Sequence, residues 1–207
     1  MRADGVLVTW CLRRNIVAAL LASAGVVAAA SFLPVVVPTP QLRGGGLEAA
    51  TALLTSFAVA MCFVPTITAG DLALEERSPR PVRAARIGFG ALLLGVTAAL
   101  VAVGVLVRGG DAAGVAAAVR TLSLASALGL AAARLGGLVA GFAATLAYLG
   151  CCLFAGAAPD GTVEPWARPL AGWQMLPDAL LLAAAAVVVL TVFAARPART
   201  RARAGMS

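Results

Sequence analysis

Long apolar runs separated by short polar segments constrain the fold of this chain more than any other feature. A run of about 20 residues can cross a hydrocarbon core of about 30 Å as an α-helix, which rises about 1.5 Å per residue. Apolar residues make up 61% of the 207 residues, well above the range of about 45 to 50% that is typical of soluble domains. The sequence therefore predicts an all-α, polytopic integral membrane protein.

We expect about six transmembrane helices within residues 15–195. Their predicted ranges are 15–37, 49–69, 87–107, 112–133, 135–156 and 178–195. Residues 1–14 form a predicted interfacial segment, and residues 196–207 form a basic cytoplasmic tail. A cleavable signal peptide is an alternative interpretation of the first 30 residues, because residues 28–31 are small. The apolar run continues to Val37, which favours a membrane-spanning helix.

The stretch 71–86, DLALEERSPRPVRAAR, sets the expected orientation of the chain. It lies between the second and third predicted spans and contains four arginines after two acids, Glu75 and Glu76. Short arginine-rich loops of polytopic proteins face the cytoplasm. With this loop inside, twelve of the sixteen basic residues, all of them arginines, lie on the cytoplasmic side together with both termini. We therefore expect a multi-pass protein of the cell membrane, whose central loop is either a topogenic signal alone or a docking surface as well.

Missing residue types exclude several kinds of chemistry. The chain has no lysine, so it contains no G-x-x-x-x-G-K-[ST] phosphate loop, and it has no histidine. The lack of histidine excludes Ser-His and Cys-His nucleophilic sites and H-E-x-x-H zinc sites. Cys151 and Cys152 are adjacent and do not form a C-x-x-C motif. We predict no catalytic residue, metal site or cofactor, and no nucleic-acid binding, because no aromatic residues interleave the basic ones.

Arg120 is the one arginine that the predicted orientation does not place on either side. If the fourth helix spans residues 112–133, Arg120 lies inside the membrane, where an arginine costs about 2.5 to 3.5 kcal/mol at the bilayer centre. Alternatively, residues 109–119 lie at the outer surface, and Arg120 begins a shorter span as an interfacial anchor. We favour the anchor, because a snorkelling arginine needs no partner, and we keep Arg120 as a candidate intramembrane charge.

Two further patterns concern helix packing and the outer surface. Gly137 and Gly141 have G-x-x-x-G spacing, which predicts a helix-packing stripe that continues to Ala144 or Thr145. Residues 157–177 form the longest predicted external segment, and the last span begins at Asp178, where the positive end of the helix dipole favours an acid.

The order of these features resembles the membrane subunit of type 2 ABC exporters. An interfacial start containing Trp10 precedes six spans, the loop 71–86 is acidic and then basic, and a tryptophan-containing hairpin, PWARPLAGWQ (165–174), precedes the last span. Permeases of this type occur in high-GC, actinobacterial genomes beside drug and natural-product export systems. The resemblance covers nearly the whole chain and depends on the layout of the segments.

The resemblance implies a separate ATP-binding subunit as partner and an outer gate. The implied ATPase contacts are Arg13, Arg14, Glu75, Glu76, Arg77 and Arg80, and the implied gate residues are Trp166 and Trp173. A second copy of the chain, or a second membrane subunit, would complete the translocation path. ATP hydrolysis would belong to the partner, so the chain itself would not be an enzyme.

The expected function is export of a drug, a peptide or a natural product, for efflux or self-resistance to an antibiotic. One alternative is a membrane-embedded enzyme that modifies a lipid or an isoprenoid. Such an enzyme would need general acids or bases in one cavity, but the candidates fall on opposite faces of the predicted topology. These candidates are Glu48, Glu75, Glu76 and Asp178. A second alternative is an accessory membrane subunit without a translocation path of its own.

Overall fold

The computed structural model of the chain describes residues 16–32, 47–68, 82–156, 163–172 and 174–194. These residues are helical apart from short turns, and they include no β-strand, as the sequence predicts. The helices are α2 (Ile16–Phe32), α3 (Leu47–Thr68), α5 (Val82–Val107), α6 (Ala112–Ala155), the 3-10 helix η1 (Arg168–Leu170) and α7 (Met175–Ala194). The predicted interfacial segment 1–14 and the basic tail 196–207 lie outside the described residues.

Helix α6 consists of two helical segments joined at Gly137. This residue has φ 80° and ψ −174°, far from helical values, and the chain reverses direction there. The first segment comprises residues 112–136 and the second residues 138–155. The sequence predicts separate helices over 112–133 and 135–156 with a tight turn between them, and the break at Gly137 agrees with that division.

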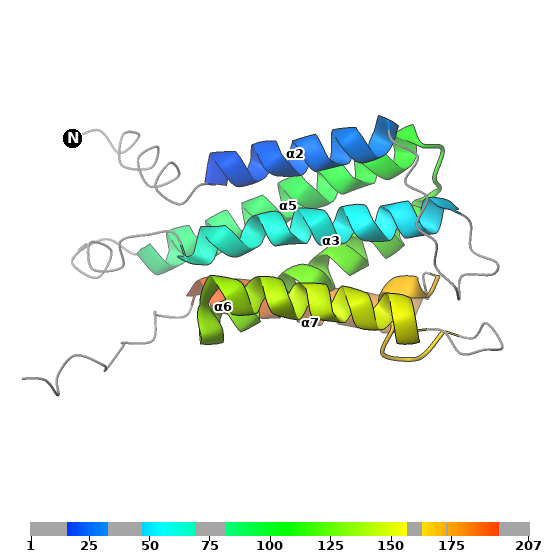
Figure 1. Cartoon of the computed structure of the whole chain (residues 1–207). Coiled ribbons are helices and arrows are strands. Elements are labelled where there is room, and N and C mark those ends of the chain that lie inside the picture. The colour runs from blue at the N-terminus through cyan, green and yellow to red at the C-terminus, as the bar shows by residue number, and fades with distance from the viewer. Residues whose placement is uncertain (1–15, 33–46, 69–81, 157–162, 173, 195–207) are drawn as a thin grey trace, which may run out of the picture.

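The helical segments lie side by side and alternate in direction (Figure 1). Helices α2 and α5 begin at one end of the bundle, where α3 and α7 finish and where α6 reverses direction; this reversal occurs at Gly137. We call this the Gly137 end. Residues 163–172, which we call the strap, lie at the opposite end, where α6 and α7 begin. Segments that follow one another in the sequence therefore run antiparallel, as in other up-and-down helical bundles.

Three described helices are long and apolar enough to cross a membrane. The qualifying ranges are Ile87–Val107, Ala112–Ala155 and Met175–Val192. Two shorter apolar helices, Val17–Phe32 and Thr51–Thr66, accompany them. Large apolar side chains also lie on the outside of the bundle, for example Phe32 and Leu135. An apolar exterior on apolar helices is the pattern expected of a protein whose surrounding solvent is lipid.

The core of the bundle lies between α3 and α6. Phe57 and Phe63 of α3 belong to one buried cluster with Leu122 and Leu130 of α6. Several buried hydroxyl groups donate to carbonyls one turn earlier in their own helix, as Thr97 does to Leu93, whereas the buried Oγ of Ser126 has no hydrogen-bond partner among the described residues. One hydroxyl joins two helices, because Ser56 Oγ lies 3.1 Å from the carbonyl oxygen of Ala118.

Gly141 allows α3 and both segments of α6 to approach closely. A Cβ atom on Gly141 would lie 2.6 Å from Val64 Cγ1 and 2.8 Å from the Cβ of Ala133. Gly141 and Thr145 are both buried, so they pack as the G-x-x-x-G pattern predicts. The assignment of Gly137 to the same stripe is wrong. Gly137 has no neighbour within 4 Å of a built Cβ and instead provides the positive φ of the turn.

Candidate functional site

A buried ion pair joins α6 to α7 at the strap end of the bundle. Arg120 lies in the third turn of α6, which begins at Ala112 after the capping residue Asp111. Asp178 lies in the first turn of α7. The Nη1 atom of Arg120 lies 2.6 Å from Oδ2 of Asp178, and both side chains have 0% of their surface exposed. Residues 58 positions apart in the sequence therefore form one charged centre inside the bundle.

The guanidinium group of Arg120 also binds the backbone of the strap. Its Nη2 atom donates to the carbonyl oxygens of Arg168 at 2.6 Å and Ala171 at 2.7 Å. Its Nη1 atom makes a longer contact of 3.4 Å with the carbonyl of Gly172. The Arg168 carbonyl also accepts the N–H of Ala171 at 3.1 Å, whereas Ala171 and Gly172 lie beyond the end of η1 and their carbonyls contact Arg120. The planar fork of arginine supplies several donors in fixed directions, so Arg120 holds the strap against α6.

Asp178 of α7 is the acidic partner of Arg120 and makes a second contact at the start of its own helix. Its Oδ2 atom also accepts a hydrogen bond from the backbone N–H of Gln174, at 2.6 Å. Gln174 precedes the first residue of α7, so Asp178 satisfies one of the free N–H groups at the helix start. The negative charge is also favoured by the dipole at this end. Asp178 therefore lies at a helix start, as predicted, but its main partner is Arg120.

The preferred interpretation of Arg120 as an exposed interfacial anchor is wrong. The helix begins eight residues before Arg120, and the side chain is fully buried. A buried guanidinium is tolerated because Asp178 supplies an opposite charge and three carbonyls accept its protons. A sequence signal for the pair existed, since one arginine and one aspartate lie within otherwise apolar helical stretches, where charged residues usually pair. No feature of the sequence predicted the hydrogen bonds between Arg120 and the strap carbonyls.

Trp166, the predicted gate residue that the structure describes, lies on the strap. Its side chain is 45% exposed, while its carbonyl oxygen accepts a hydrogen bond of 3.1 Å from the hydroxyl of Tyr148. Tyr148 belongs to the second segment of α6 and its ring packs against Phe57. The strap is thus fastened at two points, by Arg120 and by Tyr148. The remaining predicted site residues lie outside the described residues; they are Arg13, Arg14, Glu75, Glu76, Arg77, Arg80 and Trp173.

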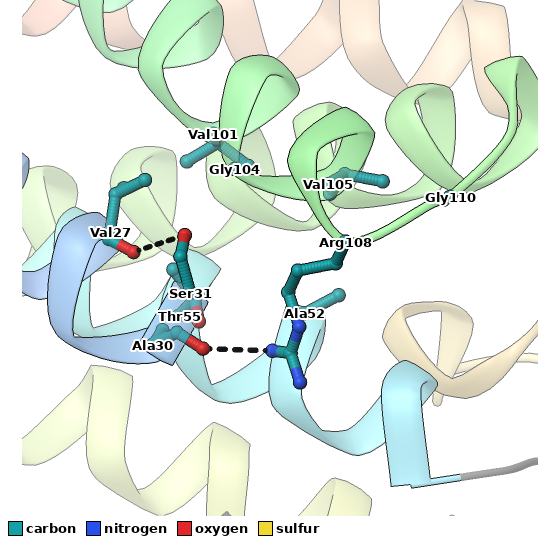
Figure 2. A pocket seen from close by; sticks show the side chains of 10 residues that line it. All are labelled: Val27, Ala30, Ser31, Ala52, Thr55, Val101, Gly104, Val105, Arg108 and Gly110. Carbon is teal, nitrogen blue, oxygen red and sulfur yellow. Dashed lines mark hydrogen bonds between the residues drawn. The ribbon is translucent and has the colours of Figure 1, made fainter. Parts of the chain in front are cut away.

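A second polar feature at the strap end is a small cavity between α2, α3 and α5. Figure 2 shows Arg108 reaching from the end of α5 toward α2, where its Nη1 atom lies 3.1 Å from the carbonyl oxygen of Ala30. Ser31 and Thr55 also line the cavity, whose volume is about 50 Å³. Ligand pockets typically measure about 300 to 1,000 Å³, so this cavity is too small for a drug-sized substrate.

The arrangement joins α6, the strap and α7 at one end of the bundle, and it provides no pair of convergent acids among the residues that the structure describes. Asp178, one of the four candidate acids for an enzyme, is neutralised by Arg120. No group of three metal-ligating side chains occurs in the parts of the chain that the structure describes. Comparisons with protein-family models, with curated proteins and with solved structures found no match.

Proposed function

We propose that this chain is the membrane-spanning permease subunit of an ATP-driven exporter. In this proposal it crosses the cell membrane six times, with both termini in the cytoplasm, and moves a drug, a peptide or a natural product outward. The single observation that supports it most is the strap, which lies at one end of an antiparallel helical bundle. Its backbone carbonyls accept hydrogen bonds from the buried Arg120 of α6. An exporter needs such a closure on its outer side.

The distribution of arginines supports the Gly137 end as the cytoplasmic one. Arg83 and Arg86 lie in the first turns of α5 at this end, and Arg134 lies just before Gly137. The loop 69–81, with two further arginines, connects α3 to α5 at the same end. Cytoplasmic loops of membrane proteins are enriched in arginine and lysine. The strap then lies on the outer side.

Energy for transport would come from a separate ATP-binding subunit, because a chain without lysine has no phosphate loop of its own. The docking surface that we propose consists of residues of both signs near the cytoplasmic end: Arg13, Arg14, Glu75, Glu76, Arg77 and Arg80. Complementary charges of both signs give register and specificity to a contact between proteins. A second copy of the chain, or a second membrane subunit, would supply the other wall of the path.

Co-purification from the native membrane tests this function. A tagged chain is expected to retain an ATP-binding subunit in mild detergent and to show ATP hydrolysis. The triple variant E75A/E76A/R77A removes three charges of the proposed docking surface and is expected to lose both the subunit and the activity. The matched control R108A/E164A removes charges at the strap end and is expected to keep both.

The proposal fails if the chain never retains an ATP-binding subunit and its deletion changes neither export nor drug tolerance. Retention of the subunit by the triple variant as well as by the wild type would keep the exporter assignment but contradict the docking surface.

A further inference from the structure

An open groove lies beside the strap, between the second segment of α6 and the first turns of α7. Its volume is about 580 Å³, within the range of about 300 to 1,000 Å³ that is usual for ligand sites. The residues that decide its chemistry are Tyr148, Trp166, Arg168, Leu180, Leu181 and Ala184. They come from three elements that the Arg120–Asp178 pair and the Tyr148 hydroxyl hold together.

The wall of the groove on α7 is an apolar stripe along the helix axis. Pro177, Leu181 and Ala184 recur at helical spacing and therefore lie on one face, together with Leu180. Leu180 is 64% exposed, so the groove is open on its side to whatever surrounds the bundle. In a membrane, that surrounding is the hydrocarbon of the bilayer. A hydrocarbon chain can thus lie along the stripe.

The end of the groove at the strap is cationic and aromatic. The Nη1 atom of Arg168 lies 2.9 Å from Oε1 of Gln174, a neutral partner. Among the described residues, no carboxylate pairs with Arg168, so this part of the chain does not neutralise its charge. The half-exposed ring of Trp166 lies at the same end, as tryptophans do at the boundary between headgroups and hydrocarbon. The carbonyl of Arg168 is fixed by Arg120, which keeps the backbone of Arg168 at this end of the groove.

We propose that this groove binds one anionic glycerophospholipid of the surrounding bilayer. The lipid phosphate pairs with Arg168 beside Trp166, and one acyl chain lies along the α7 stripe. Arginine pairs with a phosphate group through two parallel hydrogen bonds. A zwitterionic headgroup also contains a phosphate, but its net charge is zero, so it attracts Arg168 less than an anionic headgroup does. The inference needs membrane embedding but no ATP-binding partner, so its failure and that of the proposed exporter function are distinguishable.

Quenching of Trp166 fluorescence by brominated lipids tests the site. The purified variant W10F/W173F keeps Trp166 as its only tryptophan, because the chain has three. It is reconstituted in phosphatidylcholine vesicles that contain a small, equal fraction of dibrominated phosphatidylglycerol or dibrominated phosphatidylcholine. We expect the anionic lipid to quench more strongly, at a level that corresponds to about fivefold local enrichment, the size of the attraction of one arginine for an anionic surface.

Three further variants of the W10F/W173F protein distinguish the effect of the charge of Arg168 from an effect on folding. Arg168→Gln is expected to make the two lipids quench equally, and Arg168→Lys, which keeps the charge, is expected to retain a preference. Arg108→Gln removes an arginine at the same end that does not line the groove, and it is expected to leave the preference unchanged. Equal quenching by both lipids in the parent protein would overturn the proposal, as would a preference that persists in full in the Arg168→Gln variant.

Discussion

Arg120 shows why a single buried charge can organise one end of a membrane bundle. Its guanidinium contacts Asp178 and three carbonyls of the strap, and lysine, a compact point charge, could not reach these directions together. The sequence predicted Arg120 as the exceptional arginine and Asp178 as an acid at a helix start. Two charges in apolar helices were a signal for their pairing, but the contacts of Arg120 with the strap carbonyls could not be predicted, because they depend on how α6, the strap and α7 pack.

Substitutions of Arg120 and Asp178 should have non-additive effects on stability, because the two side chains form one ion pair. Arg120→Leu or Asp178→Leu alone leaves an uncompensated buried charge, so we expect each to lower the free energy of unfolding by about 3 to 5 kcal/mol. The double variant should cost less than the sum of the two, with a coupling of about 0.5 to 3 kcal/mol. Reversible unfolding in mixed detergent micelles measures all four proteins of this cycle. Additive losses would contradict a direct pair.

The backbone conformation of Gly137 reverses the direction of α6. Its φ of 80° and ψ of −174° lie in a region that is essentially restricted to glycine, and the turn divides α6 into two antiparallel segments. The sequence predicted a division between the helices 112–133 and 135–156, three residues before this position. It also placed Gly137 in a packing stripe with Gly141, because glycines in turns and glycines at close helix contacts produce the same pattern. Only the backbone conformation separates the two roles.

A matched pair of glycines tests the role of the turn. A built Cβ meets nothing within 4 Å at either Gly137 or Gly150, so neither substitution to alanine causes a steric clash, and only Gly137 has a positive φ. Gly137→Ala should therefore destabilise the protein by about 1 to 3 kcal/mol through backbone strain. Gly150→Ala, in a regular helix, should be neutral or stabilise by up to about 1 kcal/mol. Thermal unfolding in detergent compares them, and equal effects would contradict the assignment.

At the scale of the whole molecule, apolar periodicity predicted the helical architecture but not all boundaries. Helix α5 begins at Val82 and not at Ile87, because arginine and alanine are good helix formers and extend the helix beyond its apolar part. Helix α7 likewise begins at Met175, before Asp178. The central place of α3 and the fastening of the strap depend on contacts between distant residues, which hydropathy does not encode.

The account depends most on the strap and the arginine-rich loop lying on opposite sides of the membrane. Labelling with a membrane-impermeant maleimide tests this in a background without Cys11, Cys62, Cys151 and Cys152. A single cysteine replaces Pro165, which is exposed on the strap, or Ser78 in the loop. We predict that the Pro165→Cys variant is labelled in intact cells and the Ser78→Cys variant only after the membrane is permeabilised. Labelling of both in intact cells, or of Ser78→Cys alone, would contradict the account.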